Sequence, residues 1–403
     1  MSKKNIRESK KNGVNFQSNA VNGGFDNTQG VQRPVSGFKR ITLRAEPTSV
    51  HDNLQETSSS NKNSRTLPSG RGRTSGTGHS NGTAFRKARG RSDRERPNFN
   101  LNVPSNGYAW WYVDGLSYDG EKAISIIGFI GSVFSPWYAW AGRKNPHNHC
   151  CINVAMYGKG WRWTMTERGE ESLFQTEDQL KVGPSSFTWD NGKLIIEINE
   201  ISTPHLDKVI GKVTITPKVI TNIEVNLTRD GSHIWRPFAP NAEINVEIEK
   251  KGWNWQGHGY FDANFGTRAL EHDFSYWTWS RLPHRDGSIA FYDAIRRNED
   301  PLSVSLKFHS NGQVEEILAP PEARLSRSLW TVKRRTRSDS DYKPTQVKHM
   351  LDAPFYTRSA IKTKIHGEVT TGVHEALDLD RFSNPLLKPM LALRVPRTTR
   401  WKP

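Results

Sequence analysis

The 403-residue sequence contains only two cysteines, Cys150 and Cys151, which are adjacent and cannot link distant parts of the chain by a disulfide. This scarcity favours a reducing compartment. No apolar run approaches the about 18 residues that a membrane-spanning helix needs. The start of the chain, MSKKNIRESKKNG, lacks the apolar core of a secretory signal. We therefore expect a cytoplasmic protein that meets a membrane only at its surface.

The first 100 residues lack tryptophan and tyrosine, whereas all 14 Trp and all 10 Tyr follow residue 100. They carry 19 Lys and Arg against 7 Asp and Glu, a net charge of +12, which leaves 38 against 34, or +4, for the rest. Because such a segment buries too little apolar surface to offset its loss of conformational entropy, residues 1–100 are predicted to be a disordered basic tail. Its arginine-rich patches leave two interpretations open: a solvated tail, or one that touches RNA or anionic lipid.

Helical periodicity is weak in the remaining sequence, and short alternating runs separated by turn residues predominate. An example is SVSLKFHSNGQVEEI, with Asn311 and Gly312 at the position of a two-residue hairpin turn. A proline-rich joint, RPFAPNA, lies between two groups of such runs. We therefore predict an all-β fold of two successive antiparallel β-barrels, over residues 101–238 and 239–395, with a boundary near Phe238. Barrels of this size enclose a cavity suited to one apolar ligand.

The segment richest in aromatic residues is 253–279, WNWQGHGYFDANFGTRALEHDFSYWTW, which holds nine aromatic residues, two histidines and three carboxylates. Its middle part, GHGYFDANF, alternates between polar or amphipathic and apolar side chains, which predicts a β-strand. Because alternate residues of a strand point to the same face, one face carries His258, Tyr260, Asp262 and Asn264. A carboxyl, a phenol and an imidazole lie in one row among aromatic rings. If the protein has a catalytic site, we expect it at this face of the strand.

The cluster His147, His149, Cys150 and Cys151 has the composition of a metal site but not its spacing. Tetrahedral sites take their ligands from spaced pairs, whereas adjacent cysteines of a strand point to opposite faces. The glycines of GHGYFDANFG are weak evidence for nucleotide binding, because no helix follows them whose N-terminus could meet a phosphate. We therefore expect neither a metal nor an organic cofactor.

Six long, aromatic-rich blocks carry the most specific pattern of the chain. They are YAWWYVDGLSYDG from Tyr108, FIGSVFSPWYAWAGR from Phe129, HCCINVAMYG from His149, RWTMTERG from Arg162, GHGYFDANFGTRALEHDFSYWTWSR from Gly257 and FYDAIRR from Phe291. Together they resemble the carotenoid 1,2-hydratase family, also called hydroxyneurosporene synthase. The resemblance runs from about residue 105 to about residue 395 and is thin after Ser338, and the first 100 residues have no counterpart in it.

The resemblance implies a pair of lipocalin-like β-barrels and an enzyme without a metal or organic cofactor. This family adds water across the terminal 1,2 double bond of acyclic carotenoids such as neurosporene and lycopene, which yields a tertiary alcohol. Its functional residues map onto His233, Trp235, Tyr260 and Asp262, within the motifs SHIWRPF and GYFDANFG. The expected partners are an acyclic carotenoid, water and the membrane surface from which this substrate is drawn.

Hydration of such an alkene begins with protonation at C2, which produces a tertiary carbocation at C1. Asp262 is the candidate acid, because an apolar aromatic site raises the pKa of a carboxyl above its usual value near ~3.9. Trp235 and Tyr260 are candidates for stabilising the cation with their ring faces. Two schemes for the base stay open: His233 takes a proton from the attacking water, or Asp262 regains its own.

Four further residues are candidates for binding the substrate or tuning the acid: His258, Trp253, Trp255 and Trp277. The alternative for His258 is an ordinary hydrogen-bonded core histidine. For the Glu271-His272-Asp273 triplet an ion-pair cluster is favoured over a proton relay. The four family residues fall on both sides of the predicted boundary, so we expect the site near the junction of the two barrels.

Two other functions stay open for this sequence. A non-catalytic lipocalin-like carrier of an apolar polyene would need the aromatic rings but not the carboxyl. An RNA-associated protein would act through its basic tail alone, with salt-sensitive binding. Because the excess charge is confined to that tail, nucleic acid is not an expected partner of the folded part. The sequence makes no prediction of the oligomeric state.

Overall fold

A computed structural model describes residues 85–87 and 96–400 of the chain. These residues form mainly β-strands with a few short helices, which confirms the predicted all-β class. The strands form sheets of 13, 7 and 2 strands. Within the described ranges, no helix has the length and apolar character needed to cross a bilayer. Most of the predicted basic tail lies outside the described residues.

The 13-stranded sheet contains every strand up to β13. Its order is β5-β4-β3-β2-β13-β12-β10-β9-β8-β7-β6, and β11 pairs with both β1 and β12. The bounds are β1 (Phe85–Lys87), β2 (Tyr108–Ser117), β3 (Ala123–Ile130), β4 (Cys150–Tyr157), β5 (Arg162–Met165), β6 (Leu173–Gln175), β7 (Gln179–Val182), β8 (Ser185–Asp190), β9 (Lys193–Ile201), β10 (Lys208–Val219), β11 (Ile223–Asn226), β12 (His233–Ile248) and β13 (Asn254–Gly266).

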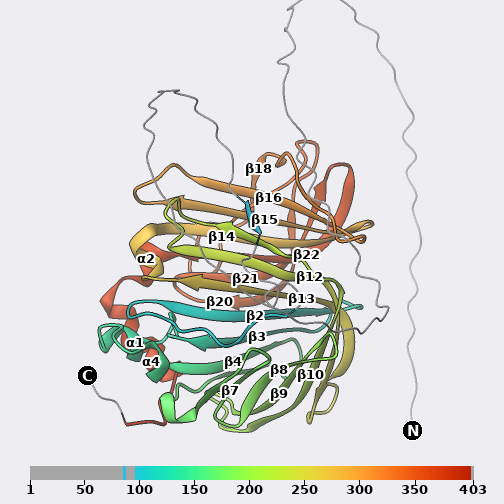
Figure 1. Ribbon diagram of the computed structural model, residues 1–403. Coiled ribbons are helices and arrows are strands. Elements are labelled where there is room, and N and C mark those ends of the chain that lie inside the picture. Colours follow the sequence, from blue (N-terminus) through green and yellow to red (C-terminus); the bar gives the residue numbers. More distant parts are fainter. Residues whose placement is uncertain (1–84, 88–95, 401–403) are drawn as a thin grey trace, which may run out of the picture. The chain divides into compact units, whose positions relative to one another are not determined.

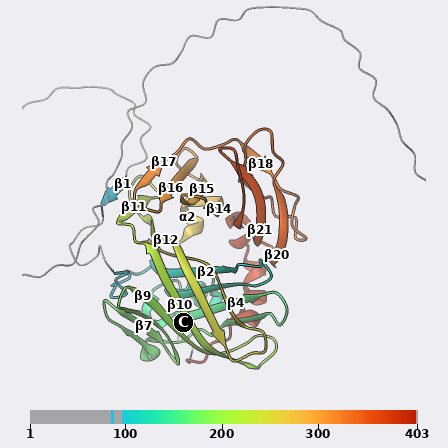
Figure 2. The ribbon, with the colours of Figure 1, turned by 90° about the vertical axis from the view of Figure 1, so that its right-hand side faces the viewer.

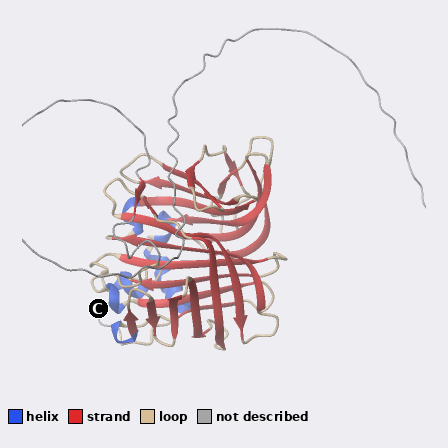
Figure 3. Cartoon of the chain, turned by 45° about the vertical axis from the view of Figure 1, so that its right-hand side comes forward, coloured by secondary structure: helices blue, strands red, loops and turns tan. Residues whose placement is uncertain are grey.

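The 7-stranded sheet follows in the chain, with the order β17-β16-β15-β14-β22-β21-β20, and β18 pairs with β19. The bounds are β14 (Phe274–His284), β15 (Gly287–Arg296), β16 (Leu302–His309), β17 (Val314–Glu316), β18 (Glu322–Arg324), β19 (Arg335–Arg337), β20 (Thr345–Asp352), β21 (Tyr356–Ile365) and β22 (Glu368–Asp378). The helices are α1 (Pro136–Trp140), α2 (Leu270–Asp273), α3 (Leu379–Phe382), α4 (Lys388–Arg394) and the 3-10 turns η2 (Pro146–Asn148), η3 (Glu170–Ser172) and η4 (Pro385–Leu387). Helices α1, α2 and α4 gather at one side of the strands (Figures 1 and 3).

The two successive closed barrels are not confirmed, because the described strands of each large sheet run in an open order from one edge strand to the other. The boundary expected near Phe238 lies inside β12, which runs from its pairing with β11 to its pairing with β10 (Figure 2). The proline-rich joint is accommodated there by two register shifts against β13, between Arg236 and Ala239 and between Ala239 and Ala242. Since bulges tolerate proline, the joint bends a strand and does not end a sheet.

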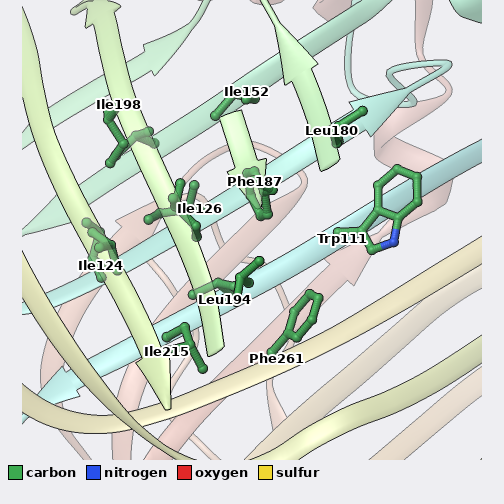
Figure 4. Packing of buried hydrophobic residues seen from close by; sticks show 14 of the residues in the cluster. Trp111, Ile124, Ile126, Ile152, Leu180, Phe187, Leu194, Ile198, Ile215 and Phe261 are labelled. Atoms are coloured by element: carbon green, nitrogen blue, oxygen red, sulfur yellow. The ribbon is translucent and has the colours of Figure 1, made fainter. Parts of the chain in front are cut away.

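Strands β2 and β13 are neighbours in the first sheet, with Tyr112 opposite Asp262. Their odd-numbered residues, among them Trp111 and Phe261, join an apolar core within the first sheet (Figure 4). Their even-numbered aromatic residues join a second cluster that also contains side chains of the 7-stranded sheet: Tyr108, Trp110, Tyr112 and Tyr260 with Trp277, Trp279 and Tyr292. One face of β2 and β13 is therefore shared between the two large sheets.

The first core reaches back into the segment that was predicted to be tail. Phe99 is fully buried and packs on Trp111, with 5.3 Å between the ring centroids. Arg96 donates two hydrogen bonds to the Asp178 carboxylate, at 3.0 and 3.2 Å. The packed structure therefore includes residues 96–100.

The C-terminal segment closes back on the first sheet. The Trp137 indole of α1 donates to the Val395 carbonyl at 2.8 Å. Arg397 forms an ion pair of 2.6 Å with Glu167, and both side chains are buried. These contacts hold α4 beside the shared face of the first sheet, where its residues help to line the cavity described below.

Candidate active site

Asp262 lies on the shared face of β13 and is only 4% exposed. One carboxyl oxygen, Oδ2, accepts two hydrogen bonds, from the Tyr260 hydroxyl at 2.7 Å and from the Trp235 indole at 2.8 Å. The other oxygen, Oδ1, is buried and receives no hydrogen bond from any described residue. The structure thus brings together three of the four predicted family residues and leaves one carboxyl oxygen uncommitted.

The surroundings of Asp262 keep its proton on the carboxyl at neutral pH. Burial raises the pKa of Asp262 to about 8, and the carboxylates of Glu375 and Asp114 add to the increase. The hydrogen bonds from Tyr260 and Trp235 oppose the increase without cancelling it. Since both donors point at Oδ2, the proton of the neutral acid belongs on Oδ1. The group is therefore a carboxylic acid with a proton that no neighbour holds.

Aromatic rings surround this acid. The Tyr260 ring lies 5.1 Å from Trp279 and 6.2 Å from Tyr112, in edge-to-face arrangements. The Trp235 ring lies 5.6 Å from Tyr292. Such rings exclude water from the carboxyl, and their negative faces attract positive charge. The environment therefore suits both a proton donor and a developing carbocation.

A cavity of about 480 Å³ lies between the two large sheets and α4. Its walls are mainly aromatic and aliphatic, and include Trp110, Tyr112, Ile127, Phe129, Trp163, Met165, Trp277, Tyr356, Leu377, Met390 and Leu391. Asp262 is not on this wall. Tyr112 on the wall packs on Tyr260, which donates to Asp262, and Trp277 on the wall lies 5.9 Å from Tyr292, which packs on Trp235. The acid is therefore connected to the cavity wall through neighbouring aromatic rings.

His233 shares its strand face with Trp235, but its side-chain hydrogen bonds go to residues other than Asp262. Its Nδ1 is 2.9 Å from the Tyr108 hydroxyl, and its Nε2 is 2.8 Å from the Asp273 carboxylate. Burial lowers the pKa of His233, although Asp273 works in the opposite direction. Both ring nitrogens of this buried, neutral imidazole are therefore occupied by protein groups.

The other predicted substrate-binding residues occupy different places. Trp277 lines the cavity. Trp253 and Trp255 lie with the first core, because odd-numbered residues of this segment face away from Asp262; the Trp253 indole donates to the Lys159 carbonyl at 3.0 Å. His258 lies at the exposed end of the strand with its ring against Tyr118, 5.0 Å away. Only Trp277 is therefore placed to touch a ligand in the cavity.

The cysteine and histidine cluster is divided among different surroundings. Cys150 belongs to the core of the first sheet and Cys151 to the shared cluster, as expected for adjacent residues of a strand. His149 pairs with Glu167 at 2.7 Å. In the part of the chain that the structure describes, no group of three or more His, Cys, Asp or Glu side chains is arranged to hold a metal ion.

The Glu271 and Asp273 carboxylates form ion pairs, as the favoured interpretation of their triplet requires. Glu271 binds Arg143 at 2.5 Å, and Asp273 binds Arg268 at 2.6 Å. Burial works to raise the pKa of Asp273, but Arg268 and His233 hold it below its usual range. Asp273 is therefore an anionic partner of His233, which sequence reasoning did not assign.

Sequence reasoning also missed a charged network that links the two large sheets. Asp114 of β2 accepts from Arg281 Nε at 2.8 Å and lies 3.1 Å from Arg358. Glu375 of β22 accepts from Arg358 and, at 2.9 Å, from the Tyr112 hydroxyl. Alternation in YAWWYVDG does place Tyr112 and Asp114 on one face. No local pattern identifies their partners, because Arg281, Arg358 and Glu375 come from other strands.

A family model described as carotenoid hydratase CrtC matches residues 126–403, about two thirds of the chain, which include His233, Trp235, Tyr260 and Asp262. The chain belongs to the carotenoid hydratase family. Acyclic carotenoid 1,2-hydratases similar to it include one from Cereibacter sphaeroides, 57% identical over 277 residues that cover 68% of this chain and 99% of that protein. One from Rhodobacter capsulatus is 50% identical over 69% of this chain and 99% of that protein. One from Thiocapsa roseopersicina is 40% identical over 91% of this chain and 92% of that protein. The family resemblance seen in the sequence is confirmed.

Proposed function

We propose that this carotenoid hydratase family member adds water across the terminal 1,2 double bond of an acyclic carotenoid, with Asp262 as the acid. The observation that carries the proposal is a buried carboxyl with a pKa raised to about 8, two donors on one oxygen and none on the other. The relatives named above, which are acyclic carotenoid 1,2-hydratases, support the substrate class.

In the first step, the proton on Asp262 Oδ1 moves to C2 of the polyene. The π electrons form the new C–H bond, which leaves a tertiary cation at C1 and a carboxylate on Asp262. Tyr260 and Trp235 already donate to Oδ2, so they stabilise the negative charge as it forms. The rings around the site stabilise the cation, each by about 1 to 2 kcal/mol in a dry site. Water then adds to C1 and releases a proton, giving a tertiary alcohol.

A positioning role for His233 fits its contacts better than the role of a base. Its two ring nitrogens are taken up by Tyr108 and Asp273, and it has no position on the cavity wall. It lies two residues from Trp235 on the same strand, so these contacts fix the strand segment from which the indole donates to Asp262. In this proposal His233 orients the acid's partner and does not touch the water.

The cavity between the sheets is the proposed carotenoid site. Its volume of about 480 Å³ can receive one end of the polyene, and its walls are mostly apolar. The polyene terminus must displace the Trp277 ring to approach Asp262, whereas Tyr112 stays hydrogen-bonded to Glu375 on the cavity wall. Rotation of one aromatic side chain is therefore part of the proposed binding step.

The cavity opening also supports peripheral binding to a membrane. Trp330 and Met390 line the cavity and are 48% and 46% exposed, so they mark its rim. Exposed apolar side chains flank them, and we call the whole set the apolar rim: Trp140, Leu329, Trp330, Leu386, Met390 and Leu393. Arg381 donates to the Trp330 carbonyl at 2.7 Å and places positive charge beside the rim. A bilayer surface against the rim would let the substrate pass directly into the cavity.

The proposal is tested by incubating the full chain with lycopene dispersed in detergent or lipid and measuring the 1-hydroxy product. The Asp262→Asn variant keeps an acceptor for Tyr260 and Trp235 but loses the acid, so we expect turnover to fall about 10²- to 10⁴-fold. Asp190→Asn removes an exposed carboxylate at the end of β8 and serves as the matched control.

The rival function, a carrier of an apolar polyene, gives a different result. A carrier binds lycopene, seen as a shift of its absorption spectrum, yet forms no alcohol in either the unchanged chain or the variant. Full hydration activity in Asp262→Asn would remove Asp262 from the mechanism.

A further inference from the structure

The cavity wall carries two carboxyl groups that the steps above do not use, those of Asp352 and Glu375. Asp352 accepts from the backbone of Leu329 at 2.5 Å, in the apolar rim. Glu375 comes from the middle of β22, and its side chain is only 14% exposed. Glu375 is thus the carboxyl that faces the interior of the cavity.

The Tyr112 hydroxyl and the Arg358 guanidinium hold the Glu375 carboxylate in place, and Tyr356 also donates to it. Its Oε1 accepts from the Tyr112 hydroxyl at 2.9 Å and from the Arg358 guanidinium. Arg358 is fully buried and also pairs with Asp114 at 3.1 Å. A carboxylate has about four lone-pair directions, so Glu375 keeps capacity for a further hydrogen bond from a molecule in the cavity.

The charges around Glu375 balance. Asp114 and Glu375 face Arg281 and Arg358, which gives two carboxylates and two guanidiniums in one buried network. Burial raises the pKa of Glu375, and the Arg358 charge opposes the increase. Burial also works to raise the pKa of Asp114, but Arg281 and Arg358 hold it below its usual range. Glu375 is therefore the carboxylate of the network that takes up a proton more readily.

Glu375 and Asp262 have a common neighbour, Tyr112. Tyr112 stands opposite Asp262 in the pairing of β2 with β13, and its hydroxyl donates to Glu375. The negative charge of Glu375 also contributes to the raised pKa of Asp262. The two carboxyls thus flank the Tyr112 ring at the inner end of the cavity.

We propose that Glu375, held by Tyr112 and Arg358, binds the attacking water and accepts its proton. This inference rests on the proposed hydration. The water oxygen uses a lone pair to form the bond to C1, one O–H bond breaks with its electrons left on oxygen, and the proton moves to Glu375. The products are the tertiary alcohol, neutral Glu375 and ionised Asp262. Solvent then removes the proton from Glu375 and returns one to Asp262, so the cycle needs no other reactant.

An experiment in heavy water distinguishes the role of Asp262 as the acid from that of Glu375 as the base. In D2O, Asp262 delivers deuterium to C2, and a cation that is not captured by water can lose the original hydrogen to the Asp262 carboxylate. The recovered lycopene then carries deuterium although no alcohol has formed. In Glu375→Gln we expect 1-hydroxy product to fall about 100-fold or more, with deuterium entry into lycopene kept within a few-fold of the unchanged chain. In Asp262→Asn we expect both to disappear.

The glutamine keeps an acceptor for Tyr112 and Arg358, so the variant tests the base with little change in shape. Tyr112→Phe is the second variant, since it keeps the ring and removes one donor to Glu375; a smaller loss of product with retained exchange is expected. Equal loss of exchange and product in Glu375→Gln, or unchanged product, would overturn the inference. Failure of the unchanged chain to make any alcohol would instead overturn the proposed hydration.

Discussion

The two faces of strands β2 and β13 differ in the polarity of their side chains and in the elements that cover them. One face places Trp111, Val113, Phe261 and Ala263 in a core of apolar side chains. The other places Tyr112, Asp114, Tyr260 and Asp262 against the second sheet, with carboxyls, phenols and guanidiniums in contact. Alternation along two neighbouring strands thus assigns packing to one face and chemistry to the other.

The second face can hold buried charged side chains because the other sheet supplies their ion-pair partners. A buried carboxylate is costly unless paired, and Asp114 finds Arg281 and Arg358 in strands that come more than 160 residues later. The first face needs no such partners, because apolar burial has no directional requirement. The comparison predicts that changes on the first face alter stability and changes on the second alter turnover.

The largest effect on stability is expected from Phe261→Ala, next to the acid in sequence. Phe261 is fully buried, and truncation of such a ring costs about 3 to 5 kcal/mol. Urea denaturation measures the loss, and turnover per folded molecule should stay within a few-fold of the unchanged chain. If Phe261→Ala lowered turnover as much as Asp262→Asn without loss of stability, the division between the faces would be wrong.

Tyr260→Phe sharpens the comparison on the second face. It removes a hydrogen bond to the Asp262 carboxylate that forms as the proton is transferred, worth about 1.5 to 3 kcal/mol, so turnover at pH 7 should fall about tenfold or more. Asp262, with a pKa of about 8, donates its proton only while protonated, so activity should decline as the pH rises through about 8. Loss of the Tyr260 donor raises that pKa further. The alkaline decline of kcat/KM should therefore move to higher pH, and a move to lower pH would contradict the assignment.

The smallest effect is expected for substitutions in the exposed apolar rim, which should change membrane binding. Replacing Leu386 and Leu393 by aspartate should weaken co-sedimentation with lipid vesicles about tenfold, because two exposed apolar side chains become charged. Val369→Asp is the matched control. Val369 is exposed on the same strand as Leu377 of the cavity, but eight residues or roughly 26 Å away. Equal loss in the control would show that the rim has no special part.

The predicted contribution of the basic tail to membrane binding can be measured in the same assay. Each Lys or Arg near an anionic surface contributes about 1 kcal/mol. Deletion of residues 1–95 should weaken binding to anionic vesicles and leave neutral vesicles unaffected. Unchanged co-sedimentation with anionic vesicles would exclude a role for the tail.

The sequence predicted local features well and distant partners poorly. Period-2 alternation in GHGYFDANF correctly gave a strand with Tyr260 and Asp262 on one face, and the family motifs located Trp235 beside them. Alternation cannot show which strand lies opposite, so Glu375 and Arg358 escaped notice, and Asp273 was not assigned as the partner of His233. The boundary predicted near Phe238 falls inside β12, because the proline-rich joint is accommodated by bulges, which composition cannot distinguish from a linker.

The C-terminal closure has a consequence for how the protein is made. The cavity wall includes residues as far apart in the sequence as Trp110 of β2 and Val395 after α4, and the Trp137 and Arg397–Glu167 contacts hold the segment around α4 in place. During synthesis the first sheet leaves the ribosome more than 100 residues before α4 does, with its aromatic face uncovered. Pigment bound at that time would meet an unfinished wall. A polyene therefore meets a complete cavity wall only after α4 has docked beside the first sheet.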